Sequence, residues 1–544
     1  MKIQFQLLGV WFLAALLPAI SLAADSDLRL VEAVKRGDTD AVRHLLQQQV
    51  DANAPQADGA TALAWAAHRN DLETAELLLR AGANVNAAND YGVTPLSLAC
   101  TNRNAAIVGR LLQAGADPNA AQMTGETALM TCARTGSVEA AKRLIEHGAD
   151  VNAREAQGGQ TALMWSVAEK HPAVARLLIE HGAEVNATSY GSDGYTPLLY
   201  AANHLAAKPV RSKASGFQPL LFAAQQGAIE SARILLEAGA DLNNSTPEYG
   251  NALVVACASG HEALALFLLE KGADPNVADG LGITPLHYAV RKGLSDLIGF
   301  QFEFQYDTYY REPWSNLPQL VKALLAAGAN PNVQIKSSLT NFPSRAPHAA
   351  RMVGATPFFF ASVSADASLM RMLAASGADP LLPARGDTTT LMVAAGGVWK
   401  AHRSEEEKKA ALEAVQLVVE MGADVNAANA AGETAMHAAA YTGADAIVEF
   451  LAKNGAQVDV GDISGETPWT MAKGISPRPS RAGLYGNHKS TANLLVELGA
   501  TPMTPEEIED FLKRAEAIPN LQRYTIPDGQ SSSGGAGSGS VKEN

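Results

Sequence analysis

Short apolar runs recur along this chain at a nearly fixed distance, separated by polar turns. Each cycle opens on a phrase of the form Thr-Pro/Ala-Leu, continues with small residues, and closes on a second run with paired apolar residues before a glycine. The first four phrases begin at Thr61, Thr94, Thr127 and Thr161, which are steps of 33, 33 and 34 residues. The spacing of apolar positions within each run is that of an amphipathic helix, so each cycle predicts a pair of short helices.

The residues at the cycle boundaries explain why such a helix pair forms. Threonine is a good N-cap, and proline after it has the dihedral angle of a first helical turn. Leu96, Ala99 and Cys100 then fall on one helical face. The glycine after the second run can adopt the left-handed conformation that ends a helix, and Asp or Asn supplies the following turn. One pair cannot bury its apolar face alone, so the cycles must stack into an all-α solenoid.

The same cycle continues through most of the chain. Further phrases, some with a substitution, begin at Gln218, Asn251, Thr284, Thr356, Thr389, Thr434 and Thr467. Gly-Ala-Asp, Gly-Ala-Asn or Gly-Ala-Glu follows in nearly every uninterrupted cycle, for example at Gly82, Gly115 and Gly272. A degenerate first cycle over 27–53 lacks the helix-start phrase, as a solvent-facing cap should, and brings the count to about twelve.

These phrases resemble the ankyrin repeat. Thr284-Pro285-Leu286-His287-Tyr288-Ala289 is similar to the family's helix start, and Gly148-Ala149-Asp150-Val151-Asn152-Ala153 to its turn. The resemblance implies an all-α ankyrin-repeat solenoid of about twelve helix-turn-helix repeats, with short β-hairpin turns and several loop insertions. The layout also resembles bacterial exported ankyrin-repeat proteins with interrupted arrays. The resemblance implies that His287 and His437 are structural hydrogen-bonding residues between neighbouring repeats.

The interruptions of the period define the predicted organisation. We expect a signal peptide over 1–24, regular repeats over 25–193, an insertion over 194–217, repeats over 218–502 with insertions at about 294–317, 333–353, 398–409 and 474–486, a C-terminal capping helix over 503–526, and a disordered Gly/Ser-rich tail over 527–544. The capping helix follows from Thr504-Pro505-Glu506-Glu507, a cap followed by a capping-box glutamate.

The first residues predict export. Lys2 is the only charge before Asp25, and an apolar run from Leu7 to Ile20 ends at Ser21-Leu22-Ala23. This is the layout of a secretory signal, with cleavage expected after Ala23 or Ala24. An uncleaved membrane anchor is the alternative. We therefore expect a periplasmic or secreted protein that, once cleaved, is monomeric and free of the membrane.

Charge and cysteine content limit the kinds of partner and of reactive group that this chain can have. The net charge of −14 opposes nucleic acid and anionic membranes as partners. Cys100, Cys132 and Cys257 fall on inner-helix core positions and are expected to be buried free thiols. No catalytic motif occurs, and we predict no catalytic residue, cofactor or metal. The repeated Asp-x-Asn, as in Asp117-Pro118-Asn119, lacks the remaining ligands of a calcium loop and is expected to form turn hydrogen bonds.

The resemblance places partners on a concave side formed by hairpin tips and inner-helix ends. The residues at those ends are His68, Arg69, Asn102, Arg134, Glu169, Lys170, Gln225, Gln226, Arg291, Lys292 and Tyr441. Arginine and lysine stand out in this row, so it would suit an acidic or polar protein partner. The alternative for each of these residues is an ordinary solvated surface position.

An aromatic cluster in one insertion is the second candidate for partner binding. It holds Phe300, Phe302, Phe304, Tyr306, Tyr309, Tyr310 and Trp314. The alternation from Phe300 to Tyr306 is that of a strand with one apolar face. Aromatic residues dominate binding hot spots, but such a hairpin could equally pack on the solenoid itself.

The sequence therefore predicts an exported protein-binding scaffold or adaptor rather than an enzyme. Two alternatives stay open: a hydrolase or carbohydrate-binding protein with a pocket built by the insertions at 187–217, 294–317 and 333–353, and a regulator that masks an exported enzyme.

Overall fold

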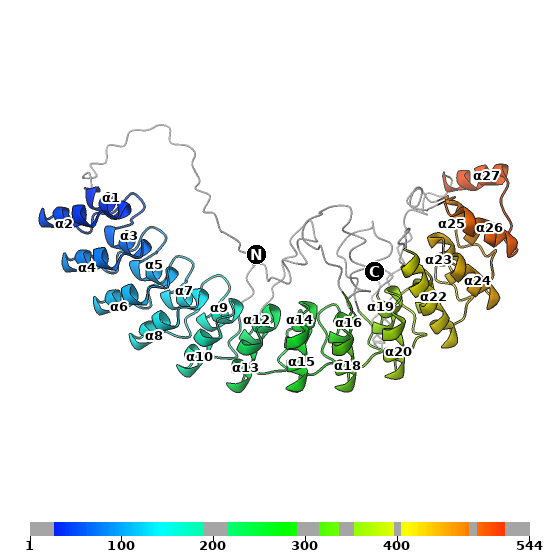
Figure 1. Cartoon of the computed structure of the whole chain (residues 1–544), viewed down its shortest axis with the longest axis horizontal. Helices are drawn as coiled ribbons and strands as arrows, with labels where there is room; N and C mark the ends of the chain where they lie inside the picture. The colour runs from blue at the N-terminus through cyan, green and yellow to red at the C-terminus, as the bar shows by residue number, and fades with distance from the viewer. Residues whose placement is uncertain are drawn as a thin grey trace, which may run out of the picture. The chain divides into compact units, whose positions relative to one another are not determined.

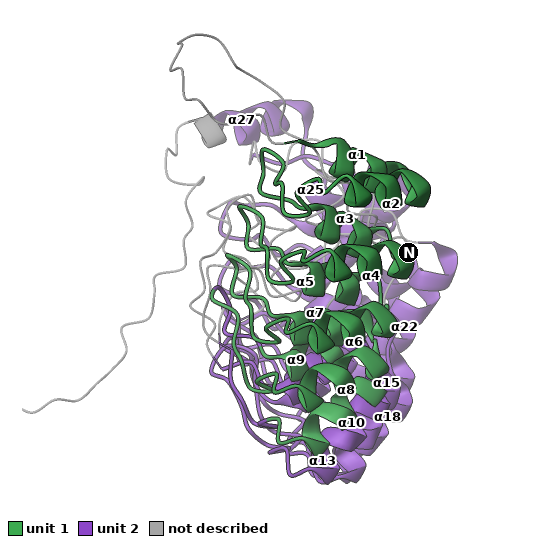
Figure 2. Ribbon diagram, turned by 90° about the vertical axis from the view of Figure 1, so that its left-hand side faces the viewer, with its two compact units in different colours: residues 1–156, 161–166, 173–183 green, residues 157–160, 167–172, 184–544 purple. Residues whose placement is uncertain are grey.

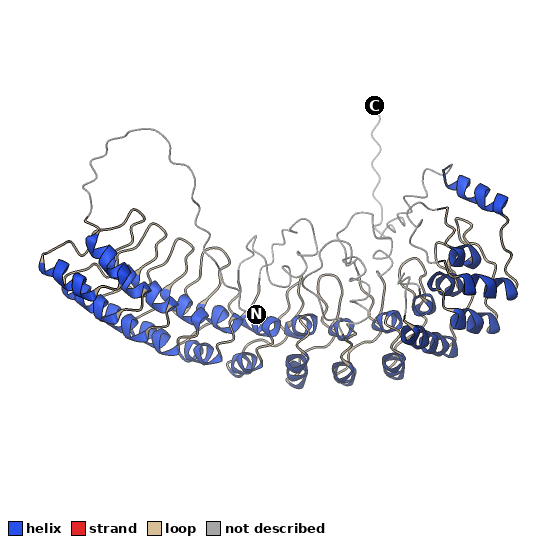
Figure 3. Ribbon diagram, turned by 45° about the horizontal axis from the view of Figure 1, so that its top comes forward, coloured by secondary structure: helices blue, strands red, loops and turns tan. Residues whose placement is uncertain are grey.

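The chain folds into repeated pairs of short α-helices. The computed structural model describes residues 27–189, 216–290, 315–336, 353–396, 404–477 and 487–516 (Figure 1). Within these ranges the helices are joined by turns and loops, and no strand is present (Figure 3). The chain divides into two compact units (Figure 2). Unit 1 comprises residues 1–156, 161–166 and 173–183, and unit 2 comprises 157–160, 167–172 and 184–544.

Unit 1 consists of two rows of helices. Its helices are α1 (Arg29–Arg36), α2 (Thr39–Gln47), α3 (Ala62–His68), α4 (Leu72–Arg80), α5 (Pro95–Thr101), α6 (Ala105–Gln113), α7 (Ala128–Thr135), α8 (Val138–Glu146), the first part of α9 (Ala162–Ala168) and nearly all of α10 (Pro172–Glu180). In the inner row α1, α3, α5 and α7 contact one another in sequence, and in the outer row α2, α4, α6 and α8 do so. This arrangement is the predicted stack of helix pairs.

Unit 2 repeats the same architecture. Its inner row holds α12 (Pro219–Gln226), α14 (Ala252–Ala258), α16 (Pro285–Ala289), α19 (Pro357–Val363), α21 (Thr390–Ala395), α23 (Ala435–Thr442) and α25 (Pro468–Lys473). Its outer row holds α13 (Ile229–Glu237), α15 (Glu262–Glu270), α18 (Pro318–Ala326), α20 (Ala367–Ala375), α22 (Glu405–Glu420), α24 (Asp445–Lys453) and α26 (Lys489–Glu497). A final helix, α27 (Pro505–Glu516), follows.

Helix α5 shows why the repeated phrase starts a helix. The Thr94 hydroxyl accepts a hydrogen bond from the Ser97 N–H at 3.2 Å, and the Ser97 hydroxyl oxygen accepts one from the Thr94 N–H at 3.1 Å. Pro95 occupies the first turn, where its missing N–H costs nothing. Leu96 and Cys100 are buried on the inner face. The predicted cap and the predicted core face are both confirmed.

The Asp-x-Asn turns join neighbouring repeats. Asn119 Oδ1 accepts from the Asp150 N–H at 2.7 Å, and Asn119 Nδ2 donates to the Gly148 carbonyl at 2.9 Å. Asp117 Oδ1 in turn accepts from the Asn119 N–H at 2.9 Å. Asn86 makes the equivalent bonds to the repeat that follows it. The asparagines therefore form a ladder along the stack, and the prediction of turn hydrogen bonds is confirmed.

The two ends of the array differ in how they are capped. The N-cap residue of α1, Leu28, makes no side-chain capping bond, as expected for a repeat without the helix-start phrase. At α27 the Glu507 N–H donates to the Thr504 hydroxyl and the Thr504 N–H donates to Glu507, so the predicted capping box is confirmed. Helix α22 begins at Glu405, inside the predicted insertion at 398–409, so part of that extra sequence lengthens a helix.

Buried histidines and thiols complete the core. His287 Nδ1 accepts from the Thr284 N–H at 3.2 Å and its Nε2 lies 3.4 Å from the Ala355 carbonyl of the next repeat. His437 has the same arrangement between Thr434 and Glu466. Both histidines thus join neighbouring repeats, as the family resemblance implied. Cys100, Cys132 and Cys257 are buried and free, and burial raises the pKa of the Cys100 thiol well above its usual value.

Candidate protein-binding surface

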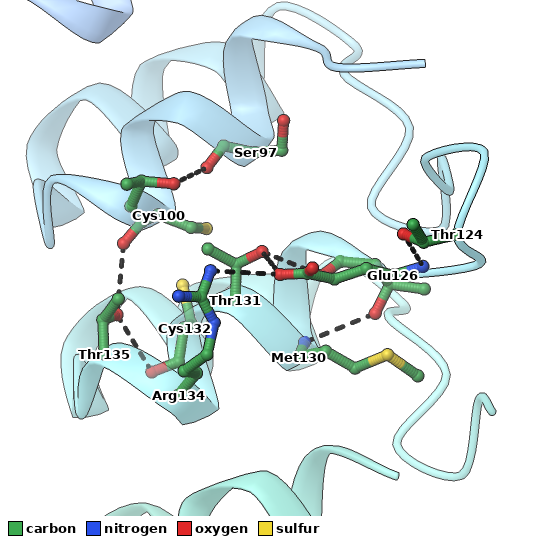
Figure 4. Close-up of polar contacts among 11 residues, drawn as sticks. Ser97, Cys100, Thr124, Glu126, Met130, Thr131, Cys132, Arg134 and Thr135 are labelled. Carbon is green, nitrogen blue, oxygen red and sulfur yellow. Dashed lines mark hydrogen bonds and ion pairs between the residues drawn. The ribbon is translucent and has the colours of Figure 1, made fainter. Parts of the chain in front are cut away.

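Hydrogen bonds connect the carboxyl ends of the inner helices in unit 1. Arg69 Nη1 donates to the Lys35 carbonyl at 2.7 Å, and Asn102 Nδ2 donates to the His68 carbonyl at 2.6 Å. The Thr135 hydroxyl donates to the Cys100 carbonyl at 3.2 Å (Figure 4). Each bond satisfies a helix-terminal carbonyl of the preceding repeat. The ends of α1, α3, α5 and α7 therefore form one continuous surface, which we call the inner-end row.

Trp65 anchors the amino-terminal part of this row. Its ring is partly buried, and its Nε1 donates to Gln56 Oε1 at 2.7 Å. The Lys35 ammonium lies 4.8 Å from the ring centroid, which is within the range of a cation–π interaction. The exposed His68 ring meets the same indole edge to face at 5.5 Å. One aromatic platform therefore carries a cation and an imidazole at the surface.

Arg134 forms a second cluster of the same kind. Its guanidinium lies 3.3 Å from Glu126 Oε1, which also accepts a bond from the Thr131 hydroxyl at 2.8 Å (Figure 4). The guanidinium also lies 5.5 Å from the Trp165 ring centroid. Trp165 Nε1 is buried and finds no acceptor in the part of the chain that the structure describes. Arg134 thus joins a carboxylate and an aromatic face while staying exposed.

Arg103 is the cation between these two clusters. It ends the turn after α5 with a φ of 58°, the left-handed region in which Gly37 and Gly136 occupy the same step of the repeat with φ of 72° and 76°. A non-glycine residue there costs on the order of 1 kcal/mol. Its side chain is exposed and has no hydrogen-bonding or ion-pair partner among the described residues. The position therefore carries a backbone penalty with no compensating contact.

The predicted site residues of unit 1 divide by role. His68, Arg69 and Arg134 are exposed on the inner-end row. Asn102 is partly buried, and its amide donates to the carbonyls of Ala67 and His68, so its contribution is structural. Sequence reasoning missed Arg103, which stands at a step held by glycine in some repeats and by Asn70 and Lys170 in others.

In unit 2 the structure agrees with only part of the predicted row. Glu169 and Lys170 are exposed and Gln226 is partly so. Gln225 is only 7% exposed and Tyr441 only 3%, so the prediction that these two side chains lie on the surface was wrong. Tyr441 instead lines a small cavity together with Met392 and Gly396 of the preceding repeat. Arg291, Lys292 and the aromatic cluster, which comprises Phe300, Phe302, Phe304, Tyr306, Tyr309, Tyr310 and Trp314, lie outside the described residues.

The buried His437 lies at a small cavity in unit 2. Tyr441, His437 and Glu433 line a cavity of about 20 Å³, which has room for one water molecule and not for a substrate. Burial lowers the pKa of His437, so its imidazole is neutral. No group of three or more His, Cys, Asp or Glu able to hold a metal ion occurs over the described ranges. Among the helices described, none combines the length and apolar character needed to cross a membrane.

Comparison with known families identifies the repeat. A family model described as "Ankyrin repeats (3 copies)" matches residues 30–122, 120–189, 157–208, 202–279, 220–300 and 407–504. These matches cover more than half of the chain, and the helix pairs fit them. The chain therefore belongs to the ankyrin-repeat family, and its array implies a protein–protein interaction scaffold.

The individual relatives that follow each match less than half of this chain. The chain is 37% identical over 100 residues to human cyclin-dependent kinase inhibitor 2A, an alignment that covers 18% of this chain and 64% of that protein. It is 35% identical over 108 residues to cyclin-dependent kinase 4 inhibitor B of Bos taurus, covering 20% of this chain and 82% of that protein. It is 26% identical over 269 residues to the E3 ubiquitin-protein ligase KEG of Arabidopsis thaliana, covering 47% of this chain and 16% of that protein.

Proposed function

We propose that this chain is an exported protein-binding scaffold or adaptor, with no catalytic activity, that docks its partner on the inner-end row of unit 1. The observation that carries the proposal is the composition of that row. Arg69, Arg103 and Arg134 lie with two partly buried tryptophans, Trp65 and Trp165, on one connected surface. Arginine and tryptophan are the residues most enriched in binding hot spots.

Export is the second element of the proposal. It rests on the single charge, Lys2, before the apolar run from Leu7 to Ile20. N-terminal sequencing of the mature protein from the exported fraction should find Ala24 or Asp25 as its first residue. Recovery of the intact leader in that fraction would contradict cleavage.

The array of repeats interrupted by insertions is a third element. We propose that the aromatic cluster between Phe300 and Trp314 adds to partner binding. Replacing Phe302 and Tyr306 together by Ala should leave the helical content unchanged and weaken partner capture, because two large apolar contacts are removed. If partner capture is unchanged, this insertion does not contribute to the binding surface.

Site-directed photo-crosslinking tests the docking surface. A photoreactive amino acid at exposed His68 samples the inner-end row, and the same amino acid at exposed Lys142 on α8 samples the outer row. In the exported fraction we expect a specific protein adduct from position 68 and none from position 142. An adduct from position 142 alone would place the partner on the outer row and refute the proposed surface.

Two of the relatives are inhibitors by name, which supports a regulator as one form of this function. If the crosslinked partner is an enzyme, addition of the purified chain should lower its activity. If the activity of that enzyme is unaltered, the proposal of a regulator is wrong and the proposal of a scaffold stands.

A further inference from the structure

We infer that the inner-end row of unit 1 binds an extended acidic polypeptide segment. This inference rests on the proposed function and specifies the chemistry of the partner. It follows from the absence of carboxylates in three inner segments of unit 1, from the hydrogen bonds and ion pairs of each arginine on the row, and from the distance between repeats.

Three neighbouring inner-helix segments of unit 1 lack carboxylates. The segments 61–70, 94–103 and 127–136 contain Arg69, Arg103 and Arg134 and no Asp or Glu. The outer helices α4 and α8 instead carry both signs of charge, for example Glu76 beside Arg80 and Glu139 beside Arg143. Because the whole chain has 56 acidic and 42 basic residues, a strip free of carboxylates is not a consequence of composition.

The three arginines are not equally available. Arg134 shares its charge with Glu126, whose side chain is 15% exposed, and Arg69 uses one N–H on the Lys35 carbonyl. Arg103 has no acceptor anywhere in the described part of unit 1. The row therefore holds an uncompensated positive charge at its centre, with partly compensated charges on either side.

The backbone at Arg103 argues that this charge serves something outside the fold. Asn70 occupies the same left-handed step with a φ of 65°, and its side-chain oxygen accepts a bond from Asn104. Asparagine tolerates this conformation and here contributes to the fold. Arginine does not favour this conformation, and the Arg103 side chain makes no bond within the described part of the fold, whereas a glycine at that step would relieve the strain. Lys170 and Ala365 take the same step with φ of 60° and 52°, so the conformation is shared by other repeats. What distinguishes Arg103 is an exposed guanidinium that no described group of the fold engages, which leaves it free to contact a ligand.

The repeat spacing sets the form of that ligand. Packed neighbouring helices lie about 8–10 Å apart, and a polyproline II chain has three residues per turn with a rise of about 3.1 Å per residue. A segment in this extended conformation lying across α3, α5 and α7 would therefore present every third side chain, on one face, to successive arginines. Acidic residues at positions i, i+3 and i+6 fit this spacing, and the indoles of Trp65 and Trp165 offer apolar contact beside them.

A polypeptide fits better than a nucleic acid. The turns that lead into α3 and α5 expose Asp58 and Asp90. These carboxylates would repel a continuous phosphate backbone but would tolerate a peptide, whose charges can be confined to one face.

Defined peptides test the inference on the full-length chain. The probe is a fluorescent peptide long enough to span three repeats, with Glu at every third position and Gly or Ser between; the control peptide has Lys in place of Glu. Fluorescence anisotropy at low salt should show binding of the Glu peptide, weakening as salt is added, and none of the Lys peptide. An oligonucleotide of equal charge should bind more weakly than the Glu peptide.

Variants at one position separate binding from folding. Arg103→Glu should weaken the Glu peptide about tenfold, and Arg103→Gly about two- to fivefold. Arg103→Gly should also raise the melting temperature, because glycine relieves the left-handed strain. A structural role for Arg103 predicts the opposite change in melting temperature. Lys142→Glu on the outer row makes the same charge change as Arg103→Glu and should leave affinity unaltered.

Several outcomes would overturn the inference. Equal affinity for the Glu and Lys peptides, equal affinity of Arg103→Glu and the unaltered chain, or tighter binding of the oligonucleotide would each do so. If position 68 crosslinks a partner while the Glu peptide fails to bind, the acidic-segment inference is wrong and the proposed function stands. If the peptide binds but no partner crosslinks at position 68, the charge preference holds and the proposed function fails.

Discussion

The buried imidazole of His287 makes stability depend on pH in a way that can be measured. His287 is fully buried, with the Thr284 N–H on one ring nitrogen and the Ala355 carbonyl 3.4 Å from the other. Burial lowers its pKa from 6.5 to about 4. The folded state therefore holds a neutral imidazole over a range of pH in which the unfolded chain would be protonated.

The sign and size of the effect follow from linkage. The contribution of His287 to stability is complete above pH 6.5 and is lost progressively as pH falls toward about 4, because only the unfolded state gains a proton in that interval. A change in pKa of this size corresponds to about 3 kcal/mol of unfolding free energy. Burial lowers the pKa of His437 too, so its contribution has the same sign. Asp279, whose pKa burial raises, acts in the opposite direction at the acidic end.

The assay compares the unaltered chain with His287→Gln, which keeps one acceptor and one donor but does not titrate. Unfolding free energies from urea titration at several pH values between 7.5 and 4.5 give a difference in which the carboxylates cancel. As pH falls over this interval, the unaltered chain should lose about 2–3 kcal/mol of unfolding free energy relative to His287→Gln. Amide hydrogen exchange in α16 would localise the effect, since repeat arrays can unfold in steps.

Two results would refute the reasoning. One is a difference between the two chains that stays constant with pH. The other is an NMR titration in which the His287 imidazole of the folded chain has a pKa near 6.5. Either would mean that water or an acceptor reaches the ring, and that the Thr284 and Ala355 contacts do not hold it neutral.

Three further predictions test the packing. Leu268→Ala on α15 removes a fully buried side chain and should lower the unfolding free energy by about 2–5 kcal/mol; an unchanged urea midpoint would contradict the packing of this helix. Asn119→Asp keeps the acceptor but removes the donor to Gly148, and should cost about 1 kcal/mol by the same measurement, whereas an unaltered value would make the asparagine ladder irrelevant to stability. Gln225→Leu should raise the unfolding free energy by about 1–3 kcal/mol, and with it the melting temperature, because the buried amide has no hydrogen-bond partner among the described residues. A lower melting temperature would show that the amide is hydrogen-bonded in the folded chain.

The fold could be predicted from the sequence because each signal in the repeat is local and has one physical meaning. Thr94 and Pro95 start a helix because an apolar run follows them, and the turn asparagines bond the neighbouring repeat through side-chain groups that recur at the same step. A single repeat would have been weak evidence. Recurrence of the same caps, apolar faces and turns at one spacing leaves few alternatives to a stack.

The surface was harder to predict, because the period gives a residue's position within its repeat but not whether neighbouring residues bury its side chain. Gln225 and Tyr441 stand at the same step as exposed His68, yet both are buried. Tyr441 lines a small internal cavity together with Met392 and Gly396 of the preceding repeat. Arg103 was missed because glycine, asparagine, lysine and alanine all occur at its step, so its charge did not stand out.

Departures from the period are therefore where function is to be sought in a chain of this kind. Most residues of a repeat array are explained by their contacts with neighbouring repeats, and a substitution that keeps those contacts gives no information about function. Arg103 replaces a residue that the turn would favour and gains no contact inside the fold. Leu381 is a second such departure: it stands two residues after Asp379, where Asn119 stands relative to Asp117, and it is 48% exposed. There the asparagine bond to the next repeat is lost and an apolar side chain faces water, so this position, like Arg103, does less for the fold than the residue it replaces.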